Sequence, residues 1–228
     1  FLIPAVNVVH AEFKKFGLNE NLQDLNLAAK AKKITETYNK NFLSLKFEDV
    51  SFDFNEKTKS KVLNSISFEL NKGQVIAITG PSGSGKTTLL NIILGLLEPQ
   101  DGKIYLNGQL ITNQSDWRSM IGYVPQNITL FDTTIRENIA LGFQPDEISD
   151  EKVYSVIKEA YITELVNSLP EKLDTVIGEN GVRLSGGQRQ RLGLARALYR
   201  DPKILVFDEA TSALDIELEN EITNEIMK

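Results

Sequence analysis

The sequence predicts an α/β fold, in which a core of strands and helices carries one helical insertion. Three patterns indicate this fold. Apolar and polar residues alternate over 43–54, as in a half-buried strand. Two short apolar runs, 74–79 and 203–207, are typical of buried parallel strands. Over 133–169 the apolar residues recur at three- and four-residue spacing, which predicts helices.

The strands of the first half follow one another closely. After the alternating segment, 66–70 predicts a second strand, which ends at the turn Asn71-Lys72-Gly73. The glycine-rich loop after 74–79 opens a helix. Residues 103–106 predict another strand, and Asn107-Gly108 gives a hairpin signal. The helix after the loop carries the apolar residues Leu89, Leu90, Ile92, Ile93 and Leu94.

Helical patterning dominates the second half. It fills 133–169 and returns over 186–199, before the apolar run at 203–207. The side chains expected on one helix face are Val153, Val156, Ile157 and Ala160, and those of the next are Ile162, Leu165, Val166 and Leu169.

Residues 1–41 differ from the rest, because amphipathic helical spacing runs through them with little turn punctuation. One interpretation is a surface helix that packs on the domain. The other is the end of a last membrane helix followed by a linker. No run in the sequence reaches the length of about 20 apolar residues that spans a bilayer.

Composition excludes several kinds of chemistry. The chain has no cysteine, which excludes disulfides, thiolate metal sites and cysteine nucleophiles. Its one histidine, His10, cannot build a histidine dyad or a zinc cluster. A formal net charge of −6 argues against a nucleic-acid-binding surface.

The glycine-rich loop at 80–87 has the spacing G-x-x-x-x-G-K-T, with a predicted strand before it and a helix after it. Its glycines let successive backbone N–H groups point at phosphate oxygens, and the helix adds the positive end of its dipole. Lys86 is suited to neutralise β- and γ-phosphates, and the Thr87 hydroxyl to coordinate Mg²⁺. The alternative, a glycine-rich turn with a chance lysine, does not require these flanks.

Two adjacent acids, Asp208 and Glu209, directly follow the largely apolar segment 203–207. In an open parallel sheet, ligands bind at the carboxyl ends of the strands. Asp208 is therefore expected to hold Mg²⁺, and Glu209 to orient or deprotonate an attacking water. The alternative is an ordinary pair of acids at a strand end.

A second anion-binding feature is expected at 184–188, where the sequence is Leu-Ser-Gly-Gly-Gln at a helix start. A simple serine-capped helix would explain the same residues. The helix continues with Arg189, Arg191 and Arg196, which are expected on a solvated face that packs on the core. Trp117, Tyr123 and Phe131 are expected in the core or at an interface.

With these motifs the chain resembles the ATP-binding-cassette (ABC) superfamily, from Phe42 to the C-terminus. The resemblance implies a P-loop NTPase cassette with an antiparallel β subdomain, a parallel-sheet core and a helical subdomain at about 127–190. It implies domains at 1–41 (end of the last membrane helix and linker) and 42–228 (nucleotide-binding domain). The cofactors it implies are ATP and Mg²⁺.

The resemblance also assigns site residues. The ATP-binding residues are Phe54, Gly80, Pro81, Ser82, Gly83, Ser84, Gly85, Lys86, Thr87 and Thr88. The signature residues, which contact ATP bound to a partner cassette, are Leu184, Ser185, Gly186, Gly187 and Gln188. The catalytic residues are Glu209, Gln126 and Lys86. The metal-binding residues are Thr87, Gln126 and Asp208. Asp215 belongs to the D-loop.

The segments 175–181, 134–139 and 123–126 look exporter-like, and Glu179 stands where exporters sense the membrane domain. The implied function is ATP hydrolysis that powers export through head-to-tail dimerisation. The implied partners are a second such domain and a transmembrane domain. The implied location is the cytoplasmic face of the bacterial inner membrane. The leader and cassette together look most similar to exporters of the lipid-linked oligosaccharide flippase type. The alternatives are a non-transport ABC ATPase, of the DNA-repair, chromosome or translation-factor type, and a P-loop kinase.

Two positions depart from the family pattern. Phe54 stands where tyrosine is commoner, which keeps the ring face for stacking. The switch histidine expected downstream of Glu209 does not occur before Lys228. The cassette is therefore expected to be C-terminally truncated, and this chain alone to be weakly active or inactive.

Overall fold

The computed structural model describes residues 42–54, 61–112, 115–178 and 184–208. Within these ranges the chain forms two compact units, one that ends at Ile121 and one that begins at Gly122. The leader 1–41 and the predicted site residues Glu179, Glu209 and Asp215 lie outside the described residues.

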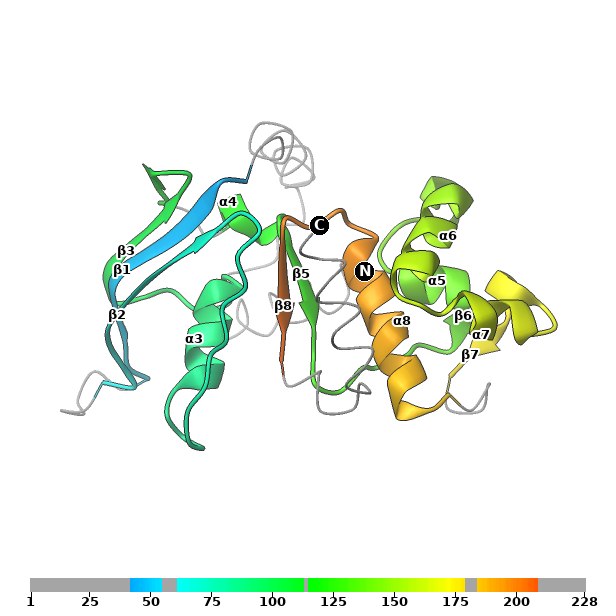
Figure 1. Ribbon diagram of the computed structural model, residues 1–228, viewed down its shortest axis with the longest axis horizontal. Coiled ribbons are helices and arrows are strands. Elements are labelled where there is room, and N and C mark those ends of the chain that lie inside the picture. Colours follow the sequence, from blue (N-terminus) through cyan, green and yellow to red (C-terminus); the bar gives the residue numbers. More distant parts are fainter. Residues whose placement is uncertain (1–41, 55–60, 113–114, 179–183, 209–228) are drawn as a thin grey trace, which may run out of the picture. The chain divides into compact units, whose positions relative to one another are not determined.

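The first unit is built on a four-stranded antiparallel sheet with the order β2-β1-β3-β4 (Figure 1). This confirms the strands predicted over 43–54, 66–70 and 103–106. The strands are β1 (Ser44–Phe52), β2 (Leu63–Asn71), β3 (Asp101–Leu106) and β4 (Gln109–Leu110). Asn107 and Gly108 join β3 to β4 with φ angles of 51° and 78°, as the predicted Asn-Gly hairpin requires.

The core of this unit lies between the sheet and helix α3 (Lys86–Ile93), which packs beside the sheet in Figure 1. Across the sheet, Phe47 on β1 stacks on Phe68 on β2, with ring centroids 4.6 Å apart. Trp117, in α4 (Ser115–Arg118), is buried, as expected, and its Nε1 donates to the Ile93 carbonyl at 2.7 Å. The predicted apolar helix residues Leu89, Leu90, Ile92, Ile93 and Leu94 are all buried.

The strand predicted at 74–79 is not formed, and that prediction was wrong. None of the described strands pairs with this segment. Its apolar side chains are open to solvent, with exposed fractions of 61% for Val75, 38% for Ile76 and 37% for Ile78. An apolar run indicates only that a segment favours burial. A strand also needs a neighbouring strand that pairs with its backbone N–H and C=O groups. The four-stranded sheet does not provide one.

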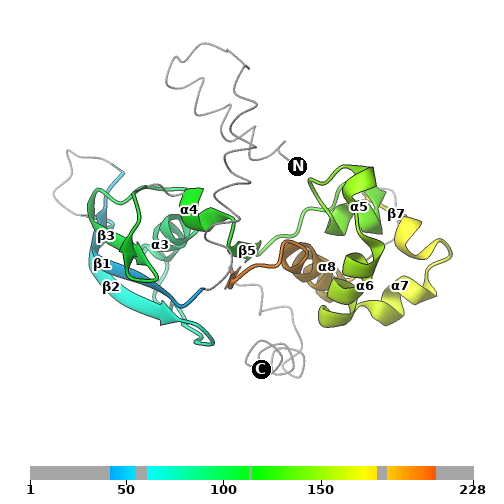
Figure 2. The same ribbon diagram turned by 90° about the horizontal axis from the view of Figure 1, so that it is seen from above.

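The second unit contains two strand pairs and a cluster of helices, which Figure 2 shows from above. Strand β5 (Ile121–Val124) pairs with β8 (Ile204–Phe207), and β6 (Thr133–Thr134) pairs with β7 (Val176–Ile177). The helices are α5 (Ile135–Ile139), α6 (Asp150–Glu159), α7 (Thr163–Ser168) and α8 (Gly186–Leu198). Two short 3₁₀ turns lie at Pro145–Glu147 and Lys172–Asp174.

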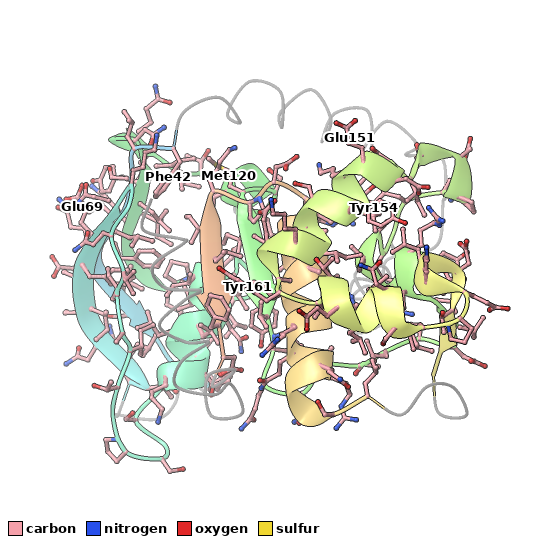
Figure 3. The ribbon with its side chains drawn as sticks, turned by 45° about the vertical axis from the view of Figure 1, so that its right-hand side comes forward. Phe42, Glu69, Met120, Glu151, Tyr154 and Tyr161 are labelled. Carbon is pink, nitrogen blue, oxygen red and sulfur yellow. The ribbon has the colours of Figure 1, made fainter. Side chains whose placement is uncertain are left out.

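Helical periodicity correctly predicted the buried faces of these helices. Val153, Val156, Ile157 and Ala160 are almost completely buried, with exposed fractions of 3% or less. In contrast, Glu151 lies on the outer side of α6, and in the first unit Glu69 lies on the outer side of the sheet (Figure 3). None of the helices in the described ranges is long and apolar enough to span a bilayer.

A buried polar side chain, Asn138 on α5, links the loop before this helix to α8. Asn138 Oδ1 accepts hydrogen bonds from the Phe131 amide at 3.0 Å and from Arg196 Nη2 at 3.1 Å. Its Nδ2 donates to the carbonyls of Phe131 and Thr134, both at 3.0 Å. Arg196 also donates to the carbonyls of Asn138 at 2.8 Å and Thr129 at 2.9 Å. Burial lowers the pKa of Arg196 to about 10.

Arg196 therefore does not lie on a solvated helix face, and this part of the prediction was wrong. The guanidinium is drawn inward because free backbone carbonyls offer it hydrogen bonds that replace those of water. Arg189 and Arg191 also bind carbonyls, those of Leu184 at 2.8 Å and Tyr161 at 3.0 Å.

Candidate functional site

The glycine-rich loop of the first unit is closed on itself around the Lys86 side chain. The Ser84 amide donates to the Pro81 carbonyl at 3.2 Å, which makes a turn. The Lys86 ammonium group donates to two carbonyls of the same loop, those of Gly80 at 2.8 Å and Pro81 at 2.9 Å. The loop therefore keeps a positive charge next to its own backbone, where a bound anion would meet it.

Gly85 starts helix α3 and has a left-handed backbone, with φ at 89°. A Cβ atom there would lie 2.9 Å from both Leu63 Cδ2 and the Val62 carbonyl oxygen, so a larger residue does not fit. No side chain caps α3, and its first turn carries no acidic residue. The amides of this first turn are thus left to an anion, and the helix dipole favours negative charge at this end.

Phe54 is the predicted adenine-stacking residue, and the structure describes it at the end of the segment that follows β1. The residue is 69% exposed. The edge-to-face contact with Phe52, whose centroid is 5.0 Å away at an interplanar angle of 85°, supports the ring from one side. Since Phe52 is buried, the exposed ring is anchored to the core of the first unit.

In the second unit, Asp208 directly follows β8 and is held at two points. Its amide donates to the Val124 carbonyl on β5 at 3.0 Å. Its Oδ2 accepts a hydrogen bond from the Tyr123 hydroxyl at 3.1 Å. Burial, together with the negative charge of Asp208, raises the pKa of Tyr123 to about 12. The phenol therefore stays protonated at neutral pH and acts as the donor.

The sequence marked Tyr123 only as the first residue of the exporter-like segment 123–126 and assigned it no role at the metal. It was expected in the core or at an interface, but its side chain is 37% exposed and hydrogen-bonded to the predicted metal-binding acid. The sequence signal is its place in the exporter-like segment 123–126, three positions before Gln126. The sequence position of Tyr123 does not show that it lies beside Asp208; only the pairing of β5 with β8 shows this.

The signature residues open α8 with a reciprocal cap. Ser185 Oγ accepts from the Gln188 amide at 3.2 Å, and the Ser185 amide donates to Gln188 Oε1 at 2.8 Å. Ser185 and Gly186 are exposed, and a Cβ at Gly186 would meet open space. The serine-capped helix is thus formed as local physics predicts. The cap uses the Ser185 oxygen as an acceptor and leaves its hydroxyl hydrogen for another group.

The comparison with protein families assigns this set of features. Residues 63–212 match the family described as ABC transporter. This chain belongs to the ABC transporter family. The match confirms the resemblance that the sequence motifs indicated, and with it the ABC cassette fold.

The known ABC transporters that are similar to this cassette include a flippase and a multidrug transporter. The chain is 45% identical over 181 residues to the ATP-dependent lipid A-core flippase of Cupriavidus metallidurans, covering 78% of this chain and 30% of the flippase. It is 44% identical over 177 residues to the ABC multidrug transporter mdr1 of Aspergillus fumigatus, covering 77% of this chain and 13% of that protein. The chain thus spans less than a third of the length of these relatives.

A solved ABC exporter has the same fold as this cassette. The structure of a bacterial Atm1-family ABC exporter with ATP bound matches 82% of this chain and 32% of its own chain, with 40% identity and a TM-score of 0.71. The prediction that this chain is an ABC cassette similar to those of ABC exporters is therefore confirmed. These relatives give no support to a non-transport ABC ATPase.

The structure describes the predicted site residues of the cassette in two separate groups. The first unit holds Phe54 and the loop 80–88, whereas the second holds Gln126, Asp208 and the signature 184–188. Gln126 lies exposed in the loop after β5. Within the described ranges, no three acidic or histidine side chains cluster in a way that could hold a metal ion.

Proposed function

We propose that this cassette binds and hydrolyses ATP and powers an ABC exporter by ATP-driven, head-to-tail dimerisation with a second cassette. The observation that supports this most directly is the phosphate loop, in which Lys86 lies over its own backbone and Gly85 opens an uncapped helix. Such a loop offers an anion a charged ammonium group and inward-pointing amides at one place.

The residues proposed for nucleotide binding are those of the first unit. Lys86 moves its ammonium group from the Gly80 and Pro81 carbonyls to the phosphates, exchanging two neutral acceptors for charged ones. The exposed ring of Phe54 stacks on the adenine. The loop amides from Gly80 to Thr88 hold the remaining phosphate oxygens.

The residues proposed to hold Mg²⁺ are Thr87, Gln126 and Asp208. They offer a hydroxyl, an amide carbonyl and a carboxylate, and such oxygen donors fit a hard cation that usually keeps several waters. The ion, when bound, would neutralise negative charge on the phosphates. Asp208 contributes a carboxylate that is already fixed through its backbone amide and Oδ2.

The residues proposed for hydrolysis and coupling include several outside the described ranges. Glu209 is the general base that takes a proton from the attacking water, and Gln126 orients that water. Ser185 and its signature neighbours donate to the γ-phosphate held by the partner cassette. Asp215 is assigned to the D-loop, and Glu179 senses the transmembrane domain.

The proposed cargo is a lipid or a lipid-linked oligosaccharide, and the proposed location is the cytoplasmic face of the bacterial inner membrane. The 45% identity to a lipid A-core flippase supports the cargo, although a multidrug transporter is 44% identical. Sequence identity in the cassette therefore reflects the shared ATP-binding domain more than the molecule that is transported. The proposed partners are a second cassette, in a homodimer, and a transmembrane domain of the same transporter.

Isothermal titration with Mg·ATP tests the proposal on the purified chain. Lys86→Ala removes the ammonium group and should weaken binding at least tenfold, the factor equivalent to about 1.4 kcal/mol. The matched control is Lys72→Ala, which removes an exposed lysine from the turn after β2 and should bind like the wild type. Equal affinities for wild type and Lys86→Ala would refute the assignment of the loop.

A further inference from the structure

We propose that Tyr123 is a positioning residue, which fixes the carboxylate of Asp208 for the Mg²⁺ of the nucleotide site. This inference rests on the proposed function, because it gives Asp208 a role at the metal. Its basis is the hydrogen bond from the Tyr123 hydroxyl to Asp208 Oδ2, 3.1 Å long, between residues that are 85 positions apart in the sequence.

The backbone of Asp208 is fixed independently of its side chain. Its amide donates to the Val124 carbonyl at 3.0 Å, which extends the β5–β8 pair by one residue beyond the end of β8. This bond sets where the Asp208 side chain starts. It leaves rotation about χ1 and χ2 free, and the Tyr123 hydroxyl is the described group that restricts this rotation.

The strand that carries Tyr123 packs tightly on the segment that precedes Asp208. A Cβ atom at Gly122 would lie 2.9 Å from Leu205 Cδ2 and 2.9 Å from Pro202 Cγ, so β5 packs directly on that segment without room for a methyl group. Because packed interiors deform little, this close contact favours a fixed separation between the Tyr123 and Asp208 segments.

The hydrogen bond gives the two carboxylate oxygens of Asp208 different roles. Oδ2 accepts from the phenol, and Oδ1 is turned to the opposite side of the carboxyl group, where it can accept from a metal-bound water or bind the ion. Hydrogen-bonding partners of this kind orient metal-binding carboxylates, and their removal typically costs about 10–100-fold in metal affinity or activity. Tyr123→Phe removes this one bond and keeps the ring.

The test compares nucleotide binding with and without the metal. A non-hydrolysable ATP analogue is titrated into the chain in the presence of Mg²⁺ and, separately, in the presence of EDTA. The readout is the affinity measured with Mg²⁺ divided by the affinity measured in EDTA. We expect Tyr123→Phe to lower this ratio about tenfold through weaker binding with Mg²⁺, with unchanged binding in EDTA.

The chain provides a matched control in the first unit. Tyr105 OH donates to Glu48 Oε2 at the same distance, 3.1 Å, and neither residue is assigned to the site. Tyr105→Phe therefore removes an equivalent phenol–carboxylate bond and should leave both affinities unchanged. Thermal unfolding of both variants verifies that they are folded.

Each outcome has a distinct meaning. A ratio for Tyr123→Phe equal to that of wild type and Tyr105→Phe overturns the positioning role. An equal loss of affinity in Mg²⁺ and EDTA also overturns it, because a purely structural defect acts on both. A wild type that binds the analogue in neither buffer refutes the proposed function itself, which separates that failure from the failure of the Tyr123 role.

Discussion

Replacing Asn138 by alanine tests whether the buried polar link between α5 and α8 holds the second unit together. Asn138 is fully buried, and its side-chain oxygen accepts from the Phe131 amide and from Arg196. Its amide group donates to the carbonyls of Phe131 and Thr134. Alanine leaves these groups without the side chain that is their partner in the structure.

The expected loss of stability follows from these bonds. Each hydrogen bond contributes about 0.5–1.5 kcal/mol net, and a buried donor left unsatisfied costs about 1–3 kcal/mol. With alternative partners for some of the carbonyls, we expect the free energy of unfolding to fall by about 3 kcal/mol. For a domain of this size, that corresponds to a decrease in Tm of about 6–12 °C.

Urea unfolding followed by far-ultraviolet circular dichroism measures this change, because the helices of the second unit dominate the signal. Asn167→Ala is the matched control: Asn167 is exposed on α7, and alanine there should change the unfolding free energy by no more than about 0.5 kcal/mol. A loss below about 1 kcal/mol for Asn138→Ala would refute the reasoning, since it would mean that the network is not needed for stability.

Three further predictions concern the site residues. Ser185→Ala removes the reciprocal cap of α8 and should cost about 1 kcal/mol, measured as a lower thermal midpoint; an unchanged midpoint would show that the cap does not stabilise the helix. Because the pKa of Tyr123 is raised to about 12 in the folded chain, its contribution to stability is present below pH 10 and is lost as the pH rises towards 12. Urea unfolding across this range should therefore show a steeper loss for wild type than for Tyr123→Phe, and parallel curves would contradict the shift. In the complete transporter, Glu209→Gln should slow hydrolysis about 10²–10⁴-fold and trap an ATP-bound dimer on size-exclusion chromatography; if no dimer accumulates, Glu209 is not the base.

Local rules predicted much of this structure. The face of α6 that holds Val153, Val156 and Ile157 could be predicted because helical spacing depends only on residues a few positions apart. The same is true of the hairpin at Asn107-Gly108 and of the cap formed by Ser185 and Gln188, which are three positions apart.

The features that the sequence did not predict depend on distant partners. Tyr123 meets Asp208 across 85 positions, and Arg196 meets the Thr129 carbonyl across 67. A side chain's own type does not say which strand or carbonyl lies next to it, so Tyr123 was expected in the core or at an interface, and Arg196 on a solvated face that packs on the core. The segment 74–79 was misassigned for the same reason, because a strand is defined by its neighbour.

The exposed run at 74–79 has a consequence for how the protein is made. The six residues Gln-Val-Ile-Ala-Ile-Thr contain no charge and no proline, and they have high β-propensity, as do segments that pair edge to edge in aggregates. Residues up to Ile121 leave the ribosome before the second unit, at about 5–20 residues per second. We expect that during those seconds the run of one nascent chain can pair with that of another. Slower expression at lower temperature, or a lysine at the largely exposed Val75, should therefore increase the yield of soluble protein.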